Sequence, residues 1–119
     1  MANSSPDPNR HLPLKPVVHL LLLALARGER HGYLLRQEVE DLSEGSVRLD
    51  PGTLYRWLGR LLDDGMLERA EEPADEEDPR RRNYRLSPFG REVLDAESAR
   101  LERLMAAAAR EGLIGEAGR

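Results

Sequence analysis

Thr53, Tyr55, Arg56 and Arg60 are the residues whose types and spacing best suit a chemical role. An arginine guanidinium carries a fork of N–H donors that matches the N7 and O6 acceptors of guanine, or the oxygens of a phosphate. Residues four apart share one face of a helix, so Arg56 and Arg60 would act together. Gly59 would let the backbone approach a partner closely. The pattern predicts a helix face that contacts duplex DNA, with Tyr55 fixing the position on the phosphate backbone.

The helix that must carry these side chains lies within residues 50–65. Asp50 suits the N-cap because its carboxylate accepts a hydrogen bond from a free N–H, and Pro51 suits the first helical position. Gly65 suits the end of the helix. The apolar face repeats at helical spacing through Leu54, Leu58, Leu61 and Leu62. An ordinary surface helix would show the same stripe and two exposed arginines, so the helix alone leaves both interpretations open.

Two further helices are predicted before this one. Residues 15–27 are apolar almost all round, which predicts burial on more than one side. A small domain rarely surrounds a helix completely, so this stretch indicates a partner subunit. Residues 31–42 form the second helix, and a turn at 43–45 with an extended link at 46–49 leads into residues 50–65.

A charged hairpin is predicted after the DNA-facing helix. Residues 66–72 and 83–86 have the pattern of short strands, joined by a polar loop at 73–82. The loop arginines predicted to contact phosphates are Arg80, Arg81 and Arg82. The acidic residues at 71–78 would be repelled by DNA. Either the arginine arm touches the backbone while the acidic arm faces solvent, or the two arms neutralise each other.

The last predicted helix covers residues 88–111 and begins with the cap-then-proline signature Ser87-Pro88. Leu94 and Leu101 are seven residues apart, and Glu97 interrupts the seam between them, so the pattern is too flawed for a long coiled coil. It suits a helix packed against residues 15–27 of its own or a partner chain. The predicted division of the chain is a tail at 1–13, a DNA-binding domain at 14–87, a dimerisation helix at 88–112 and a flexible tail at 113–119.

Composition narrows the classes of function. The chain has 119 residues, no cysteine and a net charge of −4. Disulfides and thiolate metal sites are thereby excluded, which fits a cytoplasmic location. The apolar run at 17–26 is shorter than the ~20 residues that cross a membrane. His11, His19 and His31 do not stand at a metal-binding spacing, and no nucleophile–base pair is evident, so we expect no cofactor, no metal and no enzyme.

The order helix, helix, helix, hairpin, helix predicts a mainly α (α+β) fold, a winged helix-turn-helix with an N-terminal helix and a C-terminal dimerisation helix. Four motifs then carry a resemblance to a family: His31-Gly-Tyr33, Pro51-Gly-Thr-Leu-Tyr55, Arg60-Leu61 with Asp64-Gly65, and Asn83-Tyr-Arg-Leu-Ser-Pro-Phe-Gly90. In this order and spacing they resemble the PadR family of transcriptional regulators, over about residues 16 to 111. The single short C-terminal helix is similar to that of the family's small subgroup.

The resemblance implies a dimeric DNA-binding protein, usually a repressor, that a small molecule or stress signal releases from a pseudo-palindromic operator. It also implies that the first and last helices form the dimer interface, where some relatives bind a small hydrophobic effector. The side chains expected at that interface are Val18, Leu21, Leu22, Leu94, Leu101, Leu104 and Met105.

Two positions depart from the family pattern, and the acidic wing at 71–78 is a third departure. Arg56 stands where many relatives have proline, which adds a cation to the DNA face. Ser87 replaces the usual threonine and keeps the capping hydroxyl. A protein-interaction module on a winged-helix scaffold is the competing interpretation, because fold does not fix function and the chain is acidic.

Overall fold

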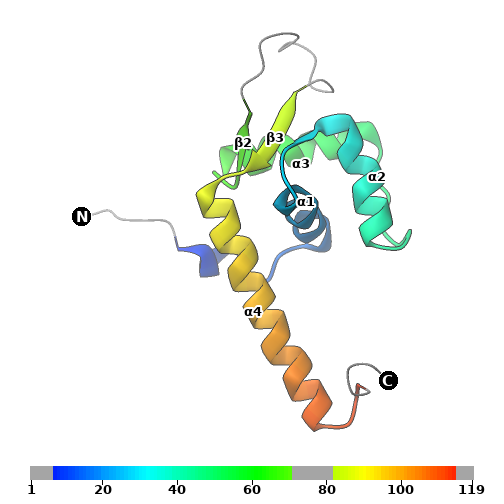
Figure 1. The fold of residues 1–119 in the computed structure, drawn as a ribbon, viewed down its shortest axis with the longest axis vertical. Coiled ribbons are helices and arrows are strands. Elements are labelled where there is room, and N and C mark those ends of the chain that lie inside the picture. Colours follow the sequence, from blue (N-terminus) through cyan, green and yellow to red (C-terminus); the bar gives the residue numbers. More distant parts are fainter. Residues whose placement is uncertain (1–6, 71–81, 115–119) are drawn as a thin grey trace, which may run out of the picture.

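The computed structural model describes residues 7–70 and 82–114 (Figure 1). It confirms the predicted mainly α fold with a small sheet. Its elements in chain order are the 3₁₀ helix η1 (Pro8–His11), α1 (Pro16–Ala26), β1 (Arg30–His31), α2 (Gly32–Leu42), α3 (Pro51–Asp63), β2 (Leu67–Arg69), β3 (Asn83–Leu86) and α4 (Pro88–Arg110).

The three strands form one antiparallel sheet in the order β1–β3–β2. In the hairpin, Leu67 pairs with Leu86 and Arg69 with Tyr84. The sequence did not predict β1, whose two residues are too few to show an alternating pattern. Because β1 pairs with β3, the start of α2 is fixed to the hairpin. Of the first hairpin strand predicted at 66–72, Leu67–Arg69 forms β2 and Met66 and Ala70 do not, while residues 71 and 72 lie outside the described ranges.

The core surrounds α1, which α2 and α4 contact on different sides (Figure 1). The side chains of Leu21, Leu22 and Leu25 are buried in one core cluster with apolar residues of α3 and the hairpin. The chain thus covers much of α1 itself, while Val17, Leu20 and Leu23 stay half-buried, so a partner at α1 remains a prediction. Four predicted interface residues are instead buried in the protein's own core: Val18, Leu21, Leu22 and Leu94.

The segment before α1 is ordered against α4. Asp7 accepts a hydrogen bond from the Asn9 N–H at 3.0 Å, which starts η1. The His11 ring meets the Phe89 ring edge-on, with 5.5 Å between centroids, and Leu12 packs against the core. The predicted tail over residues 1–13 is thus wrong for residues 8–13. Prolines and polar residues gave no periodic pattern there, but Pro8 is well suited to begin a helical turn.

The start of α4 is pressed against the base of the hairpin. The Ser87 hydroxyl accepts from the Gly90 N–H at 2.9 Å and donates to the Gly65 carbonyl. A Cβ on Gly90 would lie 2.0 Å from the Met66 carbonyl oxygen, so only glycine fits this approach. The C-terminal half of α4 extends away from the other described elements, and its Leu104 and Met105 side chains are 53% and 55% exposed (Figure 1).

Candidate nucleic-acid interface

The first turn of α3 is fixed by its cap. Asp50 accepts a hydrogen bond from the Thr53 N–H at 2.7 Å, and Pro51 occupies the first turn, as the sequence predicts. The hydrogen bonds from Thr53 hold the pKa of the Asp50 carboxyl below its ordinary value, and the nearby Arg56 and Arg36 guanidinium groups act in the same direction. A charged carboxylate therefore marks the start of this helix.

The outward face of α3 carries Arg56 and Arg60, both exposed, on the side opposite the buried leucines. The Arg56 Nη2 donates to the Thr53 hydroxyl at 3.3 Å. The Arg60 guanidinium lies over the Trp57 ring, 5.7 Å from its centroid, a cation–π geometry. Each arginine thus has a neighbour on the same helix that restrains it before any ligand arrives, which lowers the entropy lost on binding.

A shallow hollow runs along this face of α3. Its lining residues are Tyr55, Arg56, Trp57, Gly59, Arg60, Asp63 and Asp64. Tyr55 and Trp57 are half-buried and also pack against the core. The structure brings four predicted DNA-binding residues together on α3: Thr53, Tyr55, Arg56 and Arg60. Asp63 and Asp64 make the C-terminal end of the same face acidic, so its cationic part lies nearer the helix start.

The hairpin contributes Arg82, the one predicted loop arginine within the described residues. Its carbonyl accepts from the Gly32 N–H at 3.1 Å, which joins the base of the hairpin to the start of α2. Burial raises the pKa of the neighbouring Tyr84 phenol, and Arg82 opposes that rise. Arg80 and Arg81 lie outside the described residues, as do the acidic residues at 71–78.

Comparison with known proteins decides the family. A family model described as the transcriptional regulator PadR-like family matches residues 21–96. A transcriptional regulator of Mycobacterium tuberculosis is 41% identical over 99 residues, which is 83% of this chain and 83% of that protein. The chain belongs to the PadR-like family of transcriptional regulators. The resemblance carried by the four sequence motifs is confirmed.

Other similar proteins agree. A 37.1 kDa protein of a Streptomyces fradiae transposon is 39% identical over 85 residues, which is 71% of this chain; the chain spans only 23% of that protein. A PadR family regulator from Clostridium difficile superimposes with a TM-score of 0.64 at 20% identity, over 81% of this chain and 97% of that one. A PadR-like regulator from Bacillus cereus superimposes with a TM-score of 0.63 at 21% identity, over 84% of this chain and 93% of that one. These two structures establish the fold.

Two exposed residues of this PadR-like domain were not among the predicted site residues. Tyr33, at the start of α2, is 52% exposed, and its ring stacks on His31 at 5.2 Å between centroids. The Arg48 side chain is 74% exposed in the link before α3 and forms a 3.5 Å ion pair with Glu40. The available signals were the place of Arg48 two positions before Asp50 and the place of Tyr33 in the His31-Gly-Tyr33 motif.

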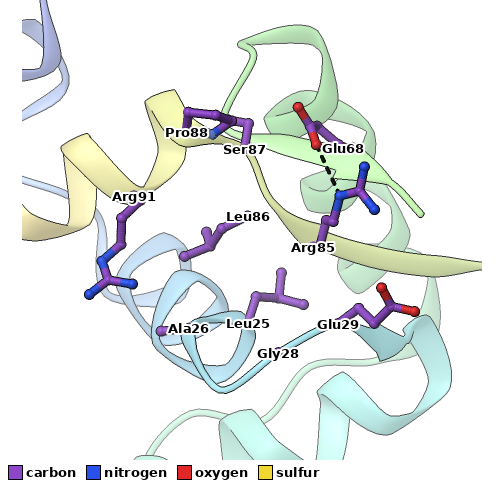
Figure 2. Close-up of a pocket in the computed structure, with 10 residues that line it drawn as sticks. All are labelled: Leu25, Ala26, Gly28, Glu29, Glu68, Arg85, Leu86, Ser87, Pro88 and Arg91. Atoms are coloured by element: carbon purple, nitrogen blue, oxygen red, sulfur yellow. Dashed lines mark hydrogen bonds and ion pairs between the residues drawn. The ribbon is translucent and has the colours of Figure 1, made fainter.

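A second hollow lies where α1 ends, the hairpin begins and α4 starts (Figure 2). Leu25 and Leu86 point into it from α1 and β3. Arg91 of α4 stands on one side, and on the other Arg85 pairs with Glu68 at 3.0 Å. None of the residues lining it belongs to α3. The hollow therefore lies beside the connection between the hairpin and α4. It is separate from the arginine face, the exposed side of α3 that carries Arg56 and Arg60.

Within residues 7–70 and 82–114, no three histidine, aspartate or glutamate side chains come together as a metal site requires. None of the helices described in those ranges is both long and apolar enough to cross a membrane.

Proposed function

We propose that this PadR-like regulator is a sequence-specific DNA-binding repressor whose helix α3 enters the major groove. One observation carries the proposal: Arg56 and Arg60 project from the exposed face of a helix whose opposite face is buried in the core. Arginine forks read guanine edges, and a helix with Gly59 on the same face can lie close to the duplex. Thr53 supports Arg56, while Tyr55 and the hairpin arginines would contact the backbone.

We also propose that the repressor is a homodimer joined through α4. Leu104 and Met105 lie exposed on the part of α4 that extends from the domain, and Leu101 is half-buried nearby. Burying these apolar side chains against a second copy would favour association. Two α3 helices would then meet successive major grooves about 34–36 Å apart, so the operator would be pseudo-palindromic.

We also propose that a small molecule or stress signal releases the repressor from DNA. A small hydrophobic effector would bind at the dimer interface. The support is connectivity: β3 passes through Ser87 directly into α4 (Figure 2). A ligand that shifts α4 would therefore shift the hairpin. We place the protein in the cytoplasm and assign it no catalytic role or cofactor.

The test is a titration of purified protein against a fluorescent duplex from the promoter of its own gene. A scrambled duplex serves as the control, and both are measured at two salt concentrations. The expected result is tight binding that is selective and falls steeply with salt, because phosphate contacts release counterions. Equal, weak binding to both duplexes would contradict the proposal for this promoter.

The second candidate, a protein-interaction module, is favoured by the net charge of −4 and by Asp63 and Asp64 beside the arginine face. It predicts that neither duplex is bound selectively at low salt. The same titration therefore separates the two functions.

A further inference from the structure

Arg36 connects α2 to the residue that immediately precedes the cap of α3. Its Nε donates a hydrogen bond of 2.8 Å to the carbonyl oxygen of Leu49, 13 positions further along the chain. Leu49 is buried in the core cluster and is followed directly by Asp50. The hydrogen bond therefore holds the backbone at the point where the chain enters α3.

The rest of the connection is held by other groups. The Ser43 hydroxyl accepts from the Val47 N–H at 3.0 Å and donates toward the Glu40 carbonyl at 3.2 Å. Glu44 and Gly45 both have positive φ, which makes the turn tight. These contacts fix the chain up to Val47 but not the last residues of the link. Arg36 acts at that remaining stretch, so its role is distinct from that of the turn.

The guanidinium of Arg36 has unused donors. Within the part of the chain that the structure describes, only its Nε is hydrogen-bonded, and the side chain is exposed. An arginine that uses one edge of its fork on a carbonyl retains Nη donors for an anion. Both Arg36 and Arg56 lie close enough to the Asp50 carboxylate to act on it electrostatically. Arg36 is thus beside the start of α3, where the proposed DNA would pass.

We propose that Arg36 has two roles at once: its Nε positions the start of α3, and its Nη groups bind a DNA phosphate. The second role rests on the proposed function, whereas the first is a property of the free protein. The consequence is that the same side chain anchors the DNA backbone and sets the register of the helix that reads the bases.

The positioning role is tested without DNA, by amide hydrogen exchange of the purified protein measured by NMR. In Arg36→Ala, the Thr53 and Leu54 amides, which bond to Asp50, should exchange roughly three- to tenfold faster, as expected for loss of one supporting hydrogen bond. The Gly90 amide, capped by Ser87 at the start of α4, should be unchanged, which would show that the effect is local to α3. Gln37→Ala is the matched control on α2. Unchanged exchange at Thr53 and Leu54 would overturn the positioning role.

The phosphate role is tested by the salt dependence of duplex binding. Arg36→Ala should reduce the slope of log affinity against log salt by about 0.9, the value for one lost phosphate contact. Arg36→Lys keeps the charge but lacks the guanidinium fork, so it should retain the slope and lose selectivity for the operator over the scrambled duplex. An unchanged slope in Arg36→Ala would overturn this role. A wild-type protein that selects no duplex would overturn the proposed function and this role together, while the exchange experiment still decides the positioning role.

Discussion

The buried carboxylate of Glu97 accepts a hydrogen bond from the Leu14 N–H at 3.1 Å, across 83 positions of sequence. Glu97 is only 2% exposed, and Arg100 completes its environment with bonds of 2.6 Å from Nε and 3.0 Å from Nη2. A buried charge is costly unless it is paired and hydrogen-bonded, and here both conditions hold. The residue that interrupts the apolar seam in the sequence therefore joins the N-terminal segment to α4.

Replacing Glu97 should destabilise the fold in a pH-dependent way. The hydrogen bonds from Arg100 lower the pKa of the Glu97 carboxyl, against burial, which raises it. A lowered native pKa contributes stability above the ordinary glutamate pKa of about 4.3, and that contribution is lost as the pH falls through the native value. Glu97→Gln should cost about 1.5–3 kcal/mol at pH 7, measured by urea unfolding, and the difference should shrink below pH 4.

The exposed Glu92→Gln on the same helix is the control for Glu97 and should change stability little. A Glu97→Gln deficit that is equally large at pH 3 and pH 7 would contradict the role of the charge.

Gly90→Ala should destabilise the protein because its Cβ would lie 2.0 Å from the Met66 carbonyl oxygen, a backbone atom. The expected cost is about 1–3 kcal/mol, typical of overpacking. Gly59→Ala is the matched control, since nothing lies within 4 Å of its added Cβ, and it should stabilise α3 by up to about 1 kcal/mol. Thermal unfolding of both variants checks the pair. Equal changes in stability for the two variants would show that α4 does not pack closely against the hairpin at Met66.

Arg56→Ala should weaken operator binding by about 1–3 kcal/mol and relax specificity at one base position. Its hydrogen bond to Thr53 lies on the exposed surface, so stability should hardly change. Arg91→Ala on α4 removes the same charge far from α3 in sequence and serves as the control. Binding measured against a panel of single-base operator variants checks the prediction. An Arg56→Ala protein with unaltered affinity and specificity would remove Arg56 from the DNA interface.

Leu104→Glu should convert the proposed dimer into monomers while the domain stays folded, because the Leu104 side chain is exposed within the single chain. Sedimentation equilibrium at micromolar concentration reports the association state, and circular dichroism reports the fold. Ser98→Glu adds the same charge at an exposed position of α4 and should leave association unchanged. Dimers that persist in Leu104→Glu would place the interface elsewhere.

The arginine face could be predicted because it depends on local periodicity. Once the Asp50 cap fixes where α3 begins, the 3.6-residue period places Leu54 and Leu58 on one side and Arg56 and Arg60 on the other. The caps at Asp50 and Ser87 were predictable for the same reason, since each bond spans three residues. The sequence alone therefore determined the four α-helices, their order and the residues exposed on α3.

Only the tertiary structure decided which surface covers each apolar face. Periodicity identifies the residues that share a face of α1 or α4, but not whether that face packs within the chain or against another one, so Leu21 and Leu94 were assigned to an interface although they form the core. The bonds from Leu14 to Glu97 and from Arg36 to Leu49 join residues far apart in sequence, and no local pattern encodes such pairs. They depend on packing, because a buried carboxylate or carbonyl oxygen must be hydrogen-bonded and pairs with the donor that the fold places beside it.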